Sequence, residues 1–336
     1  MVNDNPLWLF DQSQRSNPAD LVVGVDEAGR GPIFGPVAIG AVLFPLHFSP
    51  DPLIRDSKKM TEKQRDIAYQ WIIDYALAWS VVLIDHTEID RMNILNATLN
   101  GMKQAVEKLI IRPDRILIDG NRIPNGLDNC IAVKGGDRKS FSIAAASILA
   151  KVGRDRYVKK ANDRYPFFDL EKHKGYGTEL HLQKLKENLP SPEHRLSFEP
   201  LKSYVFPPYP DRRILGAWGE SWALYALMQK GYEFIERNVR LKHYGEIDLI
   251  MKKGEQFILI EVKTSGPNDK LDPEEWITDY KIKKMLQLSE LYFNKLGYEE
   301  YHVRLDVVIV KATNWRNPSI KHYADIIYGR ESELDS

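Results

Sequence analysis

The residues best suited to chemistry follow an apolar run near the N-terminus. Val22-Val23-Gly24-Val25 has the character of a buried strand, and Asp26 and Glu27 come directly after it, ahead of Gly29-Arg30-Gly31. Paired carboxylates at a strand end suit a hard cation such as Mg²⁺. Glycines let the main chain approach a sugar–phosphate closely, because they carry no Cβ. The pattern indicates metal-assisted chemistry on a nucleic acid, with an exposed acidic turn as the alternative.

Two further acids occupy similar positions. Ile116-Leu117-Ile118 predicts a short buried strand that ends at Asp119, and Asp137 follows a Gly-Gly turn. Four such carboxylates could hold two divalent ions about 4 Å apart, which would stabilise charge on both oxygens that change partners in phosphodiester hydrolysis. Alternation along a strand would point Asp26 and Glu27 to opposite faces, so both reach metal only if the strand stops there. From the pattern alone, a metal site and scattered surface acids are equally open.

A second group of charged residues lies on a predicted hairpin in the C-terminal part. Its turn is Lys252-Lys253-Gly254-Glu255, and Asp248 and Glu261 are spaced to lie side by side across it. Glu261 and Lys263 are two residues apart, so both point to one face while Val262 faces the core. An acidic pair can hold one divalent ion, and a lysine can stabilise developing phosphate charge. A surface cross-strand salt bridge is the alternative that spacing alone favours.

Apolar segments along the chain must position these residues. Residues 21–25, 37–44, 79–84 and 116–118 predict strands, and residues 94–110 and 140–152 predict helices. The Ala- and Ser-rich second helix is typical of one packed tightly on a sheet. The C-terminal part predicts a helix at 214–230, the hairpin, a helix at 274–296 and a strand at 303–310. Because helices and strands mix without strict alternation, we expect an α/β fold with a sheet flanked by helices.

Length and a proline-rich break predict two domains. A chain of 336 residues is long for a single core. The prolines of Val205-Phe206-Pro207-Pro208-Tyr209-Pro210-Asp211 cannot continue a helix or a central strand. We therefore expect a first domain at 20–206, a linker at 207–211 and a second domain at 212–330.

The composition limits which cellular compartment and which binding partners we expect. The single cysteine excludes an intrachain disulfide and fits a reducing, cytoplasmic location. There is no apolar run of membrane-spanning length and no secretion signal, so we expect no membrane partner. The net charge of zero gives no support to nucleic-acid binding. Basic clusters that include Arg138, Arg154 and Lys281 are interpreted as solvated faces, with binding sites as the less favoured alternative.

Motifs in the first domain together resemble the ribonuclease HII family, bacterial enzymes that cut RNA strands paired with DNA and single ribonucleotides embedded in DNA. The motifs, found between about Asp20 and Tyr204, are Asp26-Glu27-Ala28-Gly29-Arg30-Gly31, Asp56-Ser57-Lys58-Lys59, Ile118-Asp119-Gly120-Asn121, Lys134-Gly135-Gly136-Asp137, Ser142-Ile143-Ala144-Ala145-Ala146-Ser147, His173-Lys174-Gly175-Tyr176-Gly177-Thr178 and His194-Arg195-Leu196-Ser197-Phe198.

This resemblance implies a ribonuclease H-like fold with a site made by Asp26, Glu27, Asp119 and Asp137. These residues would bind Mg²⁺ or Mn²⁺ in a two-metal site, activate water and cleave 5′ to a ribonucleotide, leaving 3′-hydroxyl and 5′-phosphate ends. The implied partners are RNA–DNA hybrid duplexes and ribonucleotide-containing DNA, and the implied role is in DNA repair and replication. A hybrid-binding scaffold with a dead site is the competing interpretation, disfavoured because all four carboxylates are present.

The resemblance also implies how the substrate is recognised. Gly29, Arg30 and Gly31 match a loop that senses the 2′-hydroxyl, the group that distinguishes RNA from DNA. Tyr176 matches a tyrosine that stacks on the sugar after the ribonucleotide, whereas a tyrosine in a loop more commonly packs on its own domain. Lys58 matches a basic position near the substrate backbone. The arginine in the loop favours this family over ribonuclease HIII.

The segment from Gly219 to Val310 contains the motifs Gly219-Glu220, Arg237-Asn238, Gly245-Glu246-Ile247-Asp248-Leu249-Ile250, Glu261-Val262-Lys263 and Arg304-Leu305-Asp306-Val307-Val308. With these motifs it resembles a family of nuclease-like proteins with the PD-(D/E)xK restriction-endonuclease fold. Its candidate active-site residues are then Glu220, Asp248, Glu261 and Lys263. The family usually has an arginine soon after Glu-Val-Lys, and here Thr264-Ser265-Gly266 follows. We therefore expect either a second metal-dependent nuclease, acting on branched or linear DNA, or a non-catalytic nucleic-acid-binding module that tethers the first domain.

Overall fold

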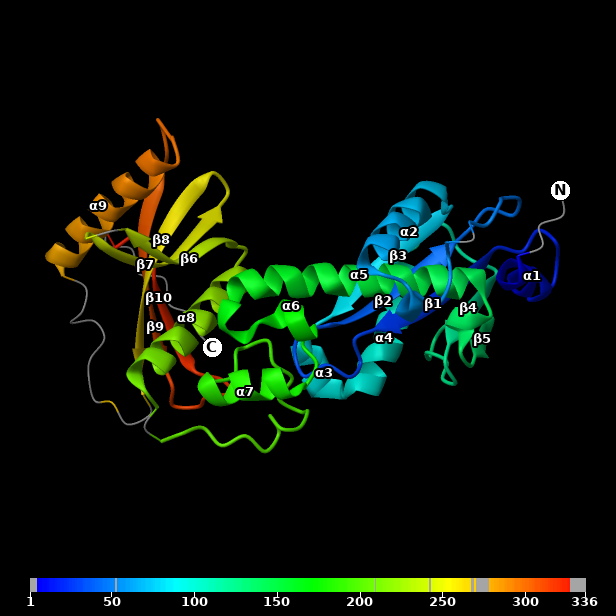
Figure 1. Cartoon of the computed structure of the whole chain (residues 1–336), viewed down its shortest axis with the longest axis horizontal. Coiled ribbons are helices and arrows are strands. Elements are labelled where there is room, and N and C mark those ends of the chain that lie inside the picture. The colour runs from blue at the N-terminus through cyan, green and yellow to red at the C-terminus, as the bar shows by residue number, and fades with distance from the viewer. Residues whose placement is uncertain are drawn as a thin grey trace. The chain divides into compact units, whose positions relative to one another are not determined.

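The structure is a computed structural model in which residues 5–326 are described, apart from 52, 209, 242, 267–268 and 270–277. The chain forms two compact units, each with its own sheet (Figure 1). Among the described residues, unit 1 takes those within 1–161, 170–177 and 193–202, and unit 2 takes those within 162–169, 178–192 and 203–326. The units alternate along the chain, and the predicted linker at 207–211 stays a prediction.

Unit 1 is built, within its described residues, around a mixed five-stranded sheet in the order β3-β2-β1-β4-β5. Its strands are β1 (Val22–Ala28), β2 (Val37–Leu43), β3 (Ala78–Ile84), β4 (Arg115–Asp119) and β5 (Cys130–Val133). β2 runs antiparallel to both β1 and β3, whereas β4 runs parallel to β1 and β5. The strands predicted from apolar runs correspond to β1–β4, and β5 was not predicted.

Helices cover both faces of this sheet. The helical elements along this part of the chain are α1 (Pro6–Ser13), η1 (Ser57–Lys59), α2 (Glu62–Tyr75), α3 (His86–Met92), α4 (Ile94–Glu107), η2 (Gly136–Arg138), α5 (Phe141–Arg164) and α6 (Leu170–His173). Ala97 of α4 packs with Val25 on one side of the sheet, and Ala145 of α5 packs with Val42 and with Ile72 of α2 on the other. This layering confirms the predicted α/β fold class (Figure 1).

Two glycines let α5 lie directly on the sheet. A Cβ at Gly24 of β1 would lie 2.1 Å from the carbonyl carbon of Ser142, and one at Gly40 of β2 would lie 2.2 Å from the carbonyl oxygen of Ala146. Both distances are far below van der Waals contact, so any side chain at these positions would push the helix away. The expected tight packing of this small-residue helix is confirmed.

Unit 2 also has a five-stranded sheet within its described residues, in the order β10-β9-β8-β7-β6. Its elements are η3 (Pro166–Phe168), α7 (Glu179–Glu187), α8 (Arg212–Gln229), β6 (Glu233–Leu241), β7 (Gly245–Lys253), β8 (Gln256–Ser265), α9 (Asp279–Lys295), β9 (Val303–Lys311) and β10 (Ser319–Tyr323). Only β8 and β9 are parallel neighbours among these described strands. The expected helix at 274–296 corresponds to α9, and residues 274–277 lie outside the described residues.

One helix packs on each face of the second sheet. Leu224 of α8 packs with Ile260, and Leu288 of α9 packs with Leu259. Since Leu259 and Ile260 are adjacent in β8, their side chains point to opposite faces. No described helix in either unit is both long and hydrophobic enough to span a bilayer.

The close approach at Gly40 gives a direct test of the packing in unit 1. Gly40→Ala should lower the free energy of unfolding by about 1–3 kcal/mol, because the added methyl group must displace main chain. Chemical denaturation followed by circular dichroism measures the change. Gly216→Ala is the matched control, since a Cβ at this position in α8 meets nothing within 4 Å. That control should gain up to about 1 kcal/mol, and a similar loss in both variants would contradict the packing argument.

Candidate active sites

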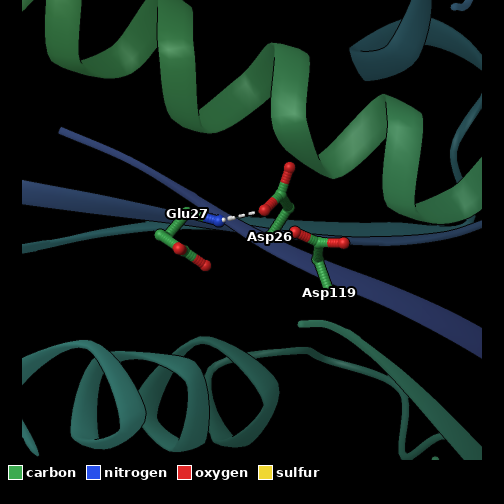
Figure 2. Close-up of side chains that lie close together, drawn as sticks. All are labelled: Asp26, Glu27 and Asp119. Carbon is green, nitrogen blue, oxygen red and sulfur yellow. Dashed lines mark hydrogen bonds between the residues drawn. The ribbon is translucent and has the colours of Figure 1, made fainter. Parts of the chain in front are cut away.

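Three acidic side chains meet where β1 and β4 end. Asp26 and Glu27 lie near the end of β1, and Asp119 is the last residue of β4. Oxygen atoms of the three carboxylates all lie within 4.8 Å of one another, in the group that Figure 2 shows. Because β1 and β4 are parallel, their carboxyl ends bring these residues to one edge of the sheet, where ligands commonly bind in α/β folds.

The path of β1 differs from the one expected. The strand was expected to stop at Asp26, but it continues to Ala28, which pairs with Ala38 of β2. On the other side of β1, pairing with β4 ends at Val25, so beside Asp26 and Glu27 this edge is open. The expected strand end was therefore wrong on the β2 side, where β1 continues. Because the β4 side is open beside Asp26 and Glu27, both carboxylates can reach the same space.

Burial and nearby carboxylates disfavour negative charge on Asp26 and Glu27. Burial raises the pKa of Asp26 well above its ordinary value, and the nearby Glu27 and Asp119 raise it further, while a hydrogen bond with Ser147 opposes them. Burial also raises the pKa of Glu27, opposed by Arg30, whose Nη1 lies 3.3 Å from Glu27 Oε1. Carboxylates that are buried or half-buried and repel one another form a set of hard oxygen donors that a divalent cation would stabilise.

The fourth predicted acid lies beside this group. The main-chain N–H of Gly136 donates to Asp119 Oδ1 over 2.6 Å, and Asp137 is the next residue. The carboxylate of Asp137 lies 3.9 Å from Nζ of Lys58 and 3.8 Å from Nε of Arg138. Burial raises the pKa of Asp137, with Lys58 opposing the change and Asp119 adding to it. The structure thus brings three predicted acids together and places the fourth next to them, against two cations.

The residues predicted to contact substrate lie around the same space. The three carboxylates line a cavity of about 350 Å³ together with Gly29, Lys58 and Tyr176. Tyr176 is 45% exposed, and its Cε1 lies 3.5 Å from where a Cβ of Gly31 would be. Gly29 has a φ of +93°, which L side chains rarely adopt. The side chain of Arg30 is 48% exposed. The structure therefore gathers the glycine-flanked loop and a tyrosine that is distant in sequence.

Two buried arginines beside this cavity were not assigned to the site by the sequence interpretation. Arg154 was interpreted as part of a solvated face, which was wrong, because it is 1% exposed and donates to main-chain carbonyls. Arg195 is 0% exposed and also donates to carbonyls. A helical period could have revealed the first: Ser147, Ala150 and Arg154 share the face of α5 that meets the sheet.

In unit 2, Asp248 and Glu261 lie where β7 and β8 separate. Pairing between these strands ends one residue short of Asp248, and the next register position would pair it with Glu261. There Asp248 Oδ2 accepts a hydrogen bond from the main-chain N–H of Val262 over 2.7 Å. Val262 packs in the core, while Lys263 Nζ lies 2.7 Å from Glu261 Oε1. The predicted neighbouring positions, and the shared face of Glu261 and Lys263, agree with the structure.

Helix α8 adds Glu220 to this second group. A Cβ at Gly219 would lie 1.8 Å from Thr264 Oγ1, so a glycine here lets α8 touch β8 at the site. Glu220 Oε2 accepts a hydrogen bond from Nη2 of Arg237 over 2.7 Å. Glu220 is also close enough to contribute to the raised pKa of Asp248. The four residues predicted for the second domain thus share one region of unit 2.

A second lysine that the sequence interpretation missed reaches this region from α9. Lys281 Nζ lies 2.7 Å from the same Oε1 atom of Glu261 that Lys263 contacts. The interpretation of Lys281 as part of a solvated face was therefore wrong. Among the described residues, the tight three-acid group of unit 1 has no counterpart in unit 2. Both glutamates of the second group instead have cationic partners.

The carboxyl group of Asp248 should make the stability of unit 2 depend on pH. Burial raises its pKa to about 7, with Glu261 and Glu220 adding to the effect. The folded state then keeps a proton that the unfolded chain releases near pH 4. This stabilisation is complete below about pH 4 and is lost as the pH rises to about 7. Without metal, unit 2 should therefore unfold more readily at neutral than at mildly acidic pH.

Thermal unfolding in a chelator-containing buffer, repeated across this pH range, measures the effect. Asp248→Asn should flatten the pH dependence because it removes the titrating group. Glu255→Gln, at an exposed position in the β7–β8 turn, is the matched control and should leave the dependence unchanged. An Asp248→Asn variant with the same pH dependence as the unmodified chain would refute the assignment.

Comparison with known families finds two matches along the chain. The Ribonuclease HII family model matches residues 23–200, and that of the Uncharacterised protein family UPF0102 matches residues 219–310. The second match coincides with the segment that resembles PD-(D/E)xK proteins. Both parts of the predicted resemblance are therefore confirmed.

Relatives match the N-terminal part. Ribonuclease HII of Acinetobacter baylyi is 46% identical over 183 residues, which cover 54% of this chain and 96% of the relative. Ribonuclease HII of Caldicellulosiruptor bescii is 49% identical over 178 residues, or 53% of this chain and 86% of the relative. A crystal structure of ribonuclease H2 from Pyrococcus horikoshii OT3 matches 55% of this chain and 96% of its own, with 29% identity and a TM-score of 0.46.

The first family match covers more than half of the chain, and the two curated relatives match it over most of their own lengths. Unit 1 has the mixed sheet flanked by helices that the resemblance implied. The protein is accordingly a hydrolytic nuclease. The chain belongs to the ribonuclease HII family.

Proposed function

We propose that the first domain, residues 20–206, cleaves the RNA strand of RNA–DNA hybrids and cuts 5′ to single ribonucleotides embedded in DNA. Its products would carry 3′-hydroxyl and 5′-phosphate ends. The observation that carries this proposal is the group of three carboxylates within 4.8 Å of one another, which shares a cavity with a glycine-flanked loop. Family membership supports the same reaction class. The cytosol is the proposed compartment, since the one cysteine, Cys130, is free.

We assign Asp26, Glu27, Asp119 and Asp137 as the residues that hold Mg²⁺ or Mn²⁺. The first three fit such ions because they offer only oxygen donors, are crowded together and repel one another when charged. Two bound ions would supply charge stabilisation at the attacking and leaving oxygens of the phosphodiester. Ser147 assists by favouring the charged form of Asp26.

Substrate recognition is assigned to the loop and side chains around the cavity. Gly29, Arg30 and Gly31 are proposed to sense the ribose 2′-hydroxyl through the main chain, because the glycines leave room for a sugar to approach. Tyr176 is proposed to stack on the sugar that follows the ribonucleotide, an arrangement that its partial exposure permits. Lys58, whose side chain is 84% exposed, is proposed to contact the substrate backbone.

Asp119→Asn tests the carboxylate assignment. The substitution keeps the shape of the side chain but weakens metal binding, so we expect the cleavage rate to fall by about a hundredfold or more. Affinity for an RNA–DNA hybrid should stay nearly unchanged. The assay measures cleavage of a DNA duplex with one ribonucleotide in Mg²⁺, and hybrid binding by fluorescence anisotropy. Asp66→Asn, at a half-exposed surface position, is the matched control. Cleavage by Asp119→Asn at the rate of the unmodified chain would exclude the four-acid site.

We propose that the second domain, residues 212–330, is a DNA nuclease that uses Glu220, Asp248, Glu261 and Lys263. The fork between β7 and β8 supports this assignment, because it holds two acids and a lysine in neighbouring positions. The alternative is a non-catalytic module that binds branched or linear DNA and tethers the ribonuclease. The cationic partners of both glutamates favour this alternative, since they compete with a metal ion for the carboxylate oxygens.

A Lys263→Ala substitution in the full chain separates these two functions. Asp119→Asn first silences unit 1, and branched and linear DNA are then supplied with Mn²⁺. A nuclease should cut one of these substrates and lose that activity with Lys263→Ala, because the lysine stabilises developing phosphate charge. DNA binding without cutting supports the module. Lys252→Ala, on the neighbouring strand β7, serves as the matched control, and equal loss in both variants would argue against a specific role for Lys263.

A further inference from the structure

The loop at residues 29–36, here named the glycine loop, is held from inside by one buried side chain. The guanidinium of Arg195 is fully buried and donates four hydrogen bonds to main-chain carbonyls of this loop. Its Nη2 donates to Gly29 over 2.7 Å, its Nη1 to Arg30 and Pro32 over 3.0 and 2.7 Å, and its Nε to Gly35 over 2.8 Å. Only a planar guanidinium can donate in this number and geometry, because an ammonium has three donors on one atom.

These bonds fix the direction of the loop amides. In a trans peptide the C=O and the following N–H point in opposite directions. Since the carbonyls of Gly29 and Arg30 turn inward to Arg195, the N–H groups of Arg30 and Gly31 turn away from it. Neither of these two N–H groups donates a hydrogen bond within the described part of the chain. Arg195 therefore leaves two main-chain donors available next to the carboxylate cavity.

A second buried arginine joins the glycine loop to the segment that carries Tyr176. Arg154 donates through Nε to the carbonyl of Pro36 over 3.2 Å, through Nη2 to that of Phe34 over 3.2 Å, and through Nη1 to that of Lys174 over 3.0 Å. Its Cζ lies 6.0 Å from the ring centroid of Tyr176. The side chain passes so close to Gly29 that a Cβ there would lie 2.0 Å from Nε.

We propose that Arg195 and Arg154 are positioning residues that set the selectivity of this enzyme for a ribonucleotide. Arg195 holds the loop carbonyls inward so that the amides of Arg30 and Gly31 face the sugar, and Arg154 fixes Tyr176 relative to that loop. The inference rests on the proposed sensing of the 2′-hydroxyl by the glycine loop. It adds two residues that touch neither the substrate nor the reacting atoms.

The turn that carries Arg195 has its own anchor. Asp90 of α3 accepts hydrogen bonds from the main-chain N–H groups of Leu196 and Ser197, over 2.8 and 3.0 Å, and from the hydroxyl of Ser197. Asp90→Asn weakens this support without changing the guanidinium. It provides a milder variant if substitution of a fully buried arginine prevents folding.

The test compares binding to two duplexes that differ only in one 2′-hydroxyl. Full-length protein with Asp119→Asn binds, in Mg²⁺, a DNA duplex containing one ribonucleotide and the same duplex without it. Arg195→Lys and Arg154→Lys are each added to this background. We expect the ratio of the two dissociation constants to fall by about tenfold in each, since a misdirected loop loses a hydrogen bond to the ribose. Asp90→Asn should lower the ratio in the same direction by a smaller factor.

Val106→Ala, at a buried core position of α4, controls for lost stability. It should lower the melting temperature and leave the ratio unchanged. A merely structural role of the arginines would weaken binding to both duplexes equally, and an unchanged ratio in folded Arg195→Lys, Arg154→Lys and Asp90→Asn proteins would overturn the inference. If the Asp119→Asn background itself binds both duplexes equally, the proposed 2′-hydroxyl sensing fails instead.

Discussion

Repulsion between carboxylates crowded at the ends of two parallel strands is the constraint on which unit 1 depends. Asp26, Glu27 and Asp119 would move apart if the strands that carry them could shift, because burial strengthens their repulsion. The surrounding structure prevents this movement. The sheet continues past the acids on the β2 side, and α5 lies against it with no room for a side chain at Gly24 or Gly40. The rigid frame keeps an unfavourable charge arrangement ready for a cation.

Much of this arrangement could be predicted, because the patterns behind it are local. Apolar runs gave strands β1–β4, and acids at their ends marked the site. The end of β1 could not be predicted in this way. β1 stops pairing with β4 at Val25 but pairs with β2 as far as Ala28, and a local apolar pattern does not distinguish the two neighbours. β5 was missed because its apolar run, Cys130–Val133, is only four residues long. The roles of Arg154 and Arg195 were not predicted, because their partners in the glycine loop are carbonyls 118 to 166 residues away.

Unit 2 also holds acidic side chains close together, but basic side chains balance their charge. Asp248 and Glu261 also lie where paired strands separate, but Glu220 contacts Arg237, and Glu261 contacts both Lys263 and Lys281. The hairpin, its turn and the shared face of Glu261 and Lys263 follow from period-2 alternation, which sequence displays directly. The contact of Lys281 with Glu261 depends on how α9 packs across the sheet, and no short-range pattern encodes that.

The aromatic cluster of unit 2 has a consequence for dissecting the chain into fragments. The ring of Phe206 lies 5.5 Å from that of Trp218 and 6.2 Å from that of Trp315, which also meets Tyr204 at 5.2 Å. A fragment that begins after the proline-rich segment, at residue 212, would lack Tyr204 and Phe206, leave Trp218 and Trp315 without these rings and expose an apolar surface. A C-terminal fragment for biochemical work should therefore begin at residue 203, so that it contains the whole aromatic cluster.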